Sequence, residues 1–277
     1  MTNFWEQGAE YDEQTAGRGD GLTRVYWMNG EPRDKTPGRF WVAQNRIVDQ
    51  GIELGEPWKV QSHTFRGGDT NDLYFASALY LAPICWKQQN YKGDGQGGVA
   101  EWIEGRKFSK LEAGESIAYE MLCLMQGFGS QPVVLSTKGT KTSMAFAAKI
   151  LPDFKKLRDA VKKARSGAVV PPWWFWLAIR SERDAKGGIV YEKTKGTQVT
   201  PPIWVMPENL EDREVWTKLY VGNELAAIGQ QVYSEIGKEW AQRPISDGYA
   251  PREDAAAVGV ENRNVPKPIE SDDDMPF

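Results

Sequence analysis

Short runs in which apolar and polar side chains alternate predict β-strands in the first third of the chain. The first run is 23–28, and apolar positions at 40–42, 47–48 and 58–64 predict further short strands around a turn-prone stretch, 49–57. Strands of this length bury one face each and have to pair with others to be stable. The N-terminal part is therefore expected to contribute to a β-sheet.

Apolar residues at longer spacing predict helices. Residues 112–127 read as a core-facing helix, and 210–240 as one long terminal helix. Residues 153–165 place apolar side chains at a spacing of three and four on one face and Lys and Arg on the other, the pattern of an amphipathic helix. The aromatic and aliphatic segment 73–84 fits either a helix or a strand.

The middle of the chain predicts paired strands. Two strand-like runs, 133–136 and 142–150, flank a polar turn. A long hairpin follows, with arms at 173–180 and 189–205 joined by a turn at 184–188. The fold class is therefore α+β or mainly β.

Composition is that of a soluble globular protein, with 40% hydrophobic and 26% charged residues among 277. Residues 1–242 are expected to form the folded body, and 243–277, which lacks apolar periodicity, a flexible acidic tail. The sequence has no apolar run long enough for a membrane span and no signal-peptide pattern, so a cytoplasmic location is predicted. Cys85 and Cys123 stand among apolar residues and are expected to be free, buried thiols.

Charge is distributed unevenly. The net charge is −4, and residues 243–277 carry 4 basic and 8 acidic side chains, so the body is balanced. Within the body, residues 137–200 carry 14 Lys and Arg against 5 Asp and Glu. One basic segment and an acidic tail are typical of a polyanion binder whose tail can shield its basic surface.

The densest aromatic cluster lies inside this basic segment. On a strand, alternate rings can face the solvent, where bases stack at about 1–3 kcal/mol each while Lys and Arg neutralise phosphates. Aromatic strands also commonly fill cores, which is the competing interpretation. The candidate DNA-binding residues are Trp173, Trp174, Trp176, Arg180, Arg183, Tyr191, Lys193 and Lys195, with Lys138 and Lys141 on the preceding turn.

The sequence ends with Asp272, Asp273, Asp274, Met275, Pro276 and Phe277. A terminal Phe can insert its ring into an apolar pocket while a basic residue pairs its carboxylate, and the Asp run adds steering toward a basic groove. This stretch resembles the C-terminal tip of bacterial single-stranded DNA-binding proteins, with Met275 where Ile or Leu is commoner. The resemblance covers the tail alone.

The resemblance implies a sequence-independent single-stranded DNA-binding protein of replication, recombination or repair. It implies an oligonucleotide-binding barrel with added helices, and replication and repair enzymes as partners of the tip. Family members usually have a shorter ordered domain and a longer tail, so the chain resembles a phage-encoded or mobile-element relative. A monomer and a homo-oligomer both remain open.

Motifs for cofactor or metal chemistry are weak. His63 is the only histidine, and no zinc-ligand spacing can be built with the two cysteines. The string 93–98 satisfies GxGxxG without a strand-to-helix context, and 138–143 imitates only part of a phosphate loop. The sequence therefore predicts no cofactor, no metal and no enzymatic activity.

Three other functions fit parts of the same pattern. A strand-annealing recombinase would use the same basic and aromatic residues. An interaction protein that imitates the tip to divert host enzymes would need only 272–277. A nuclease would need Mg²⁺ held by scattered carboxylates, for which surface acids are the simpler explanation.

Overall fold

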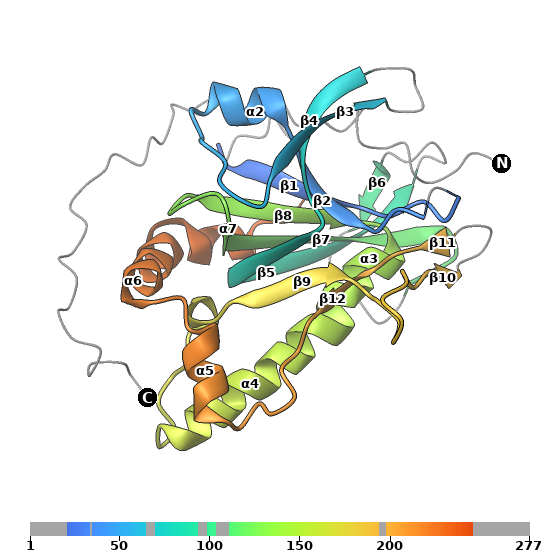
Figure 1. The fold of residues 1–277 in the computed structure, drawn as a ribbon. Helices are drawn as coiled ribbons and strands as arrows, with labels where there is room; N and C mark the ends of the chain where they lie inside the picture. Colours follow the sequence, from blue (N-terminus) through green and yellow to red (C-terminus); the bar gives the residue numbers. More distant parts are fainter. Residues whose placement is uncertain are drawn as a thin grey trace.

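A computed structural model of the protein describes residues 21–33, 35–64, 70–93, 99–103, 111–193 and 198–245 (Figure 1). Lys195 and all of 246–277, including the six tip residues, lie outside the described residues. The predicted flexible tail is therefore not tested by the structure.

Ten strands of the described chain form one sheet in a mixed α+β fold (Figure 1). The strand order is β12-β9-β5-β7-β8-β1-β2-β4-β3, with β6 paired to β5, and the sheet is strongly curled into a half-barrel. β1 and β8 are parallel, and the other paired neighbours are antiparallel. The strands are β1 (Thr23–Met28), β2 (Arg39–Ala43), β3 (Lys59–Thr64), β4 (Thr70–Ala76), β5 (Ala78–Gly93), β6 (Val99–Ile103), β7 (Glu115–Met125), β8 (Pro132–Lys138), β9 (Leu177–Ser181) and β12 (Pro202–Trp204).

Helical segments cover the two faces of this sheet. The longest is a continuous rod, about 35 Å long at the α-helical rise, made of α3, the π-helical turn η1 and α4. A separate two-stranded hairpin, β10 (Glu192–Lys193) and β11 (Gln198–Val199), lies beside the start of the rod (Figure 1). The helical segments are α2 (Gln44–Asp49), α3 (Thr140–Met144), η1 (Ala145–Ile150), α4 (Leu151–Ala164), the 3₁₀ turn η2 (Pro172–Trp174), α5 (Arg213–Leu219), α6 (Asn223–Val232), the π-helical turn η3 (Tyr233–Gly237) and α7 (Lys238–Gln242).

The two faces of β7 define the two sides of the core. The inner face carries Tyr119, Met121 and Cys123 and packs against the rod, where Phe146 stacks on Tyr119 with ring centroids 5.6 Å apart. The outer face carries Leu122 with its neighbours on β5 and β8, and α6 and α7 cover it. The central strands are thus buried on both sides.

This burial on both sides overturns the predicted helix at 112–127. Ten of the eleven β7 side chains are buried, so apolar residues occupy successive positions and the alternation of a half-buried strand is lost. A continuous apolar run does not separate helix from strand by periodicity alone. The ambiguous segment 73–84 likewise belongs to strands, β4 and β5.

The predicted strand at 142–150 is also wrong, because these residues are helical. Phe146 and Ile150 continue the buried stripe of α4 backward at a spacing of four, so one amphipathic rod begins well before 153. At its start, the buried Ser143 hydroxyl donates to the Ile117 carbonyl at 2.9 Å and ties the rod to β7. Residues 47–48, expected in a strand, lie in α2.

The terminal segment is broken where one long helix was expected. The chain leaves α5 at Tyr220 in an extended conformation, and Gly222 takes a φ of +89°, which favours glycine. α6 then begins at Asn223. The predictions of strands at 23–28, 40–42, 58–64 and 133–136 and of the amphipathic helix are confirmed.

The expected long hairpin is present in part. β9 pairs with β12 in the antiparallel sense, with Arg180 opposite Ile203. Between them the chain makes two further turns, one closed where Asp184 N–H donates to the Gly188 carbonyl at 2.9 Å, and one at the β10–β11 hairpin. Its arms are therefore not paired along their full length.

Both cysteines are free and buried, as predicted. Burial raises the pKa of each thiol to about 12. None of the helices in the described ranges has the length and apolar character needed to cross a bilayer.

Candidate nucleic-acid interface

The aromatic stretch 173–176 begins in a 3₁₀ turn, and its first ring is buried. Trp173 is 4% exposed and packs against Tyr233 with ring centroids 5.1 Å apart, so its ring does not face solvent. Trp174 is partly buried between the Arg165 guanidinium, 4.8 Å from its ring centroid, and Tyr220. Trp176 is also partly buried, against the outer-face cluster.

Backbone contacts show what this stretch does in the fold. Trp176 N–H donates to the Leu219 carbonyl at 2.8 Å, and Val221 N–H donates to the Trp174 carbonyl at 3.0 Å. These two hydrogen bonds therefore hold the segment between α5 and α6 against residues 174–176. A packing role accounts for the density of aromatic residues here without a ligand.

The exposed tryptophan of the described chain is one that sequence reasoning missed. Trp86 on β5 is 37% exposed and lies opposite Met121, which places it on the inner face. Seven other described Trp side chains are buried, and three are partly buried. No local sequence signal separates Trp86 from the buried tryptophans, because buried Cys85 precedes it and buried Gln89, Asn90 and Tyr91 follow it on the same strand.

The cationic residues of the predicted hairpin are spread over several elements. Arg180 is partly buried on β9, on the face opposite the inward Ile179. Arg183 is exposed and donates to the Gly187 carbonyl at 3.2 Å, while the Tyr191 hydroxyl donates to the Thr36 carbonyl at 3.0 Å. Lys193 is exposed on β10.

Lys138 and Lys141 lie on different sides of the sheet. Lys138 is opposite Ala118 on β7, and Ala118 belongs to the outer-face cluster with Tyr91 and Ile245. The Nζ of Lys138 is 5.9 Å from the Trp102 ring centroid. Burial lowers the pKa of Lys138 to about 7. Lys141 is in α3, the start of the rod on the inner face. The two lysines therefore do not extend one continuous track.

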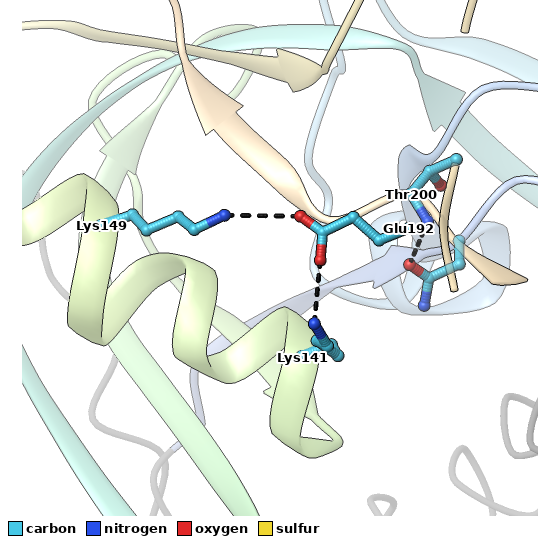
Figure 2. Close-up of polar contacts among 5 residues, drawn as sticks. Lys141, Lys149, Glu192 and Thr200 are labelled. Atoms are coloured by element: carbon cyan, nitrogen blue, oxygen red, sulfur yellow. Dashed lines mark hydrogen bonds and ion pairs between the residues drawn. The ribbon is translucent and has the colours of Figure 1, made fainter. Parts of the chain in front are cut away.

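Lys141 belongs instead to a three-residue cluster at the start of the rod (Figure 2). Its Nζ is 3.1 Å from Glu192 Oε2, and Lys149 Nζ is 3.4 Å from Oε1 of the same carboxylate. Side-chain exposure is 51% for Lys141, 65% for Lys149 and 25% for Glu192. Lys149 was not among the predicted residues, because it lies within 142–150, the segment expected to be a strand, which the structure shows to be helical.

The pKa of Glu192 lies below its usual value. Burial, the largest single influence, raises this pKa, but the hydrogen bonds and charges of Lys141 and Lys149 together outweigh it. The carboxylate is therefore ionised at neutral pH and balances part of the positive charge of the two lysines.

The base of the β10–β11 hairpin is anchored in the sheet by a fully buried threonine. Gly30 N–H donates to Thr200 Oγ1 at 2.6 Å, and Thr200 N–H donates to Asn29 Oδ1 at 3.1 Å. Trp27 Nε1 donates to the Thr200 carbonyl at 3.0 Å. This anchoring fixes where Glu192 meets the rod.

Other lysines of the basic segment are paired along α4. Lys155 and Lys156 form ion pairs with Asp159 and Asp153 within the same helix. Lys163 is exposed near the far end of the rod, about 30 Å along its axis from Lys141. The positive charge counted in the sequence is therefore spread along the rod and over β9 and β10, and does not form one continuous surface.

Comparison of the chain with family models, with curated proteins and with solved structures found no match. The interpretation of the site accordingly rests on its own geometry. Its accessible chemistry consists of two ammonium groups at a docked hairpin, which suit a phosphate oxygen or another small anionic group.

Proposed function

We propose that the protein binds single-stranded DNA without sequence preference in replication, recombination or repair, and recruits partner enzymes through 272–277. The observation that carries the proposal is the ordered tip sequence, three Asp residues followed by Met275, Pro276 and Phe277. The exposed Lys141–Lys149 pair supports it with a place for backbone phosphates.

In this proposal the interface lies around the start of the rod. Lys141, Lys149 and Lys193 supply sequence-independent phosphate contacts. Trp86, with its exposed ring on the inner face, takes the stacking role first expected of Trp173. Trp174 and Trp176 serve mainly to seat the terminal helices.

The curled sheet supplies the body of the interface. Proteins with similar tips use a five-stranded oligonucleotide-binding barrel, and we propose that the half-barrel plays the corresponding part here. The β10–β11 hairpin lies beside the start of the rod (Figure 1), and in this proposal the strand binds along that part of the surface.

DNA binding is tested by titrating the protein with poly-dT while following Trp fluorescence at several salt concentrations, with duplex DNA as the control. Saturable quenching that weakens with salt is expected, and Trp86→Phe should reduce its amplitude. Absence of quenching, together with unchanged mobility of a labelled strand in a gel, would remove DNA binding from the proposal.

The lysines are tested by a matched pair of double variants. Lys141→Ala with Lys149→Ala should make the slope of log K against log salt shallower by about 0.7 for each single-strand phosphate that the lysine pair contacts. Lys155→Ala with Lys156→Ala makes the same change in charge within α4 and should leave the slope nearly unchanged. Equal changes in both double variants would place the interface elsewhere.

Partner recruitment is tested by deleting 272–277. The shortened protein should bind poly-dT with unchanged or slightly higher affinity, because six residues with three negative charges are removed. Binding to proteins that recognise such tips should be lost. Loss of DNA binding on deletion would contradict this division of labour.

A further inference from the structure

The carboxylate of Glu192 in the hairpin contacts two lysines of another element. Glu192 lies on β10, whereas Lys141 and Lys149 lie two turns apart on the rod, and the carboxylate directs one oxygen to each lysine (Figure 2). A phosphodiester presents two non-bridging oxygens in a similar arrangement. The carboxylate therefore occupies the position in which a backbone phosphate would make the same two contacts.

Exchange between the two anions is physically easy. All three side chains reach solvent, with Lys149 the most exposed at 65%, and such partly exposed ion pairs stabilise a fold only weakly. A nucleic-acid strand offers many phosphates and releases its condensed counterions on binding. A strand can thus displace an internal carboxylate that an isolated phosphate ion would not.

We propose that Lys141 and Lys149 form a subsite for one backbone phosphate of a nucleic-acid strand, and that Glu192 occupies this subsite in the free protein. The inference rests on the proposed function and adds that the Glu192 carboxylate competes with the strand for the two lysines. Glu192 keeps the lysines oriented and lowers the affinity for small anions, so that binding favours a polyanion.

The surrounding contacts show which part of the hairpin stays in place. Thr200 stays anchored through Gly30 and Asn29, and the Tyr191 hydroxyl stays bound to the Thr36 carbonyl, since none of these contacts involves Glu192. Displacement of the Glu192 carboxylate by a phosphate therefore leaves these anchors of the hairpin intact.

The test replaces Glu192 and an unrelated carboxylate with the same change in charge. Glu192→Gln should tighten binding of an oligo-dT, measured by fluorescence anisotropy, by about 2- to 20-fold, because the bound strand no longer displaces a carboxylate. Glu208→Gln, at an exposed position before α5, should change affinity less than twofold. Equal tightening in both variants would overturn the inference, since net charge alone would explain it.

The gain must also depend on the lysines. Adding Lys141→Ala and Lys149→Ala to Glu192→Gln should abolish the tightening, and its persistence would overturn the proposed competition. Circular dichroism and the melting temperature of each variant show whether it is folded.

A second ligand separates this inference from the proposed function. Inorganic tripolyphosphate, titrated by calorimetry, should bind Glu192→Gln more tightly than the wild type and Glu208→Gln. That result without any oligo-dT binding would support the subsite and reject the DNA function. Wild-type oligo-dT binding with no effect of Glu192→Gln on either ligand would reject the inference and leave the DNA function standing.

Discussion

Glu120 on β7 is the carboxylate on which the protein is expected to depend most for stability. It is 1% exposed and lies between two cations, with Oε1 3.6 Å from Nε of Arg24 on β1 and Oε2 3.7 Å from Nζ of Lys87 on the adjacent strand β5. Lys87 Nζ is also 4.2 Å from the centroid of the Trp240 ring, so α7 closes over the cluster. Both cations are nearly as buried as the carboxylate, at 5% and 9%.

Glu120→Ala would remove the carboxylate that both buried cations contact. Removing one partner of a buried ion pair typically costs about 3–5 kcal/mol, because the remaining charge stays desolvated. At about 2–4 °C per kcal/mol for a chain of this size, the melting temperature should fall by roughly 6–20 °C. Urea denaturation followed by circular dichroism measures the free-energy change directly.

The matched control is the surface pair between Lys92 and Glu101. Its Nζ–Oε2 distance is shorter, 2.9 Å, but the side chains are 49% and 59% exposed. Glu101→Ala should barely change stability, since water solvates the ammonium group that remains. A loss below about 1 kcal/mol for Glu120→Ala, or equal losses in the two variants, would refute the reasoning from burial.

Three further predictions concern packing, capping and titration. Gly229→Ala should lower the free energy of unfolding by about 1–2 kcal/mol in urea denaturation, because a Cβ there would lie 2.5 Å from Trp173 Cδ1. This overlap is expected to exceed the gain of about 1 kcal/mol in helix propensity. A variant more stable than the wild type would show that α6 can shift away from Trp173. Asp212→Ala should cost about 0.5–2 kcal/mol by removing the carboxylate that accepts from Glu214 N–H at the start of α5, and Asp212→Asn should restore most of it. The pKa of Lys138 is about 7 in the folded protein against an ordinary 10.5, so between these pH values the unfolded chain binds more protons than the folded one. The free energy of unfolding should therefore rise with pH across this window, by up to about 1.4 kcal/mol per pH unit. Lys138→Met should remove this rise, so the variant's advantage over the wild type should be largest below pH 7; parallel pH profiles of the two proteins would contradict the assignment.

The fold was predictable where one face of an element meets water. The helix around Phe154, Leu157 and Val161 was predicted because its apolar stripe alternates with exposed Lys and Arg. β7 was misread because both its faces are covered, and a segment surrounded by protein has no polar face to reveal its period. The rod's early start was missed because 142–150 was interpreted as strand-like, although Ala145, Ala147 and Ala148 favour a helix and Phe146 and Ile150 continue its buried stripe.

The sequence likewise did not reveal which charged and aromatic side chains of the candidate site are exposed. The sequence located a basic, aromatic segment, but not that Trp173 packs against Tyr233 or that Trp86 is exposed. Burial depends on which elements meet in space, and no local pattern contains that information.

The sequence by itself determined the presence of strands and an amphipathic helix, the uneven distribution of charge and the composition of the tip, because these depend on residue type and near neighbours. Tertiary structure alone decided that Lys141, Lys149 and Glu192 form one cluster, although Glu192 is separated from the lysines by more than 40 residues. An ion pair depends on distance between charges in space, and that distance is set by how the sheet curls and where Thr200 anchors the hairpin.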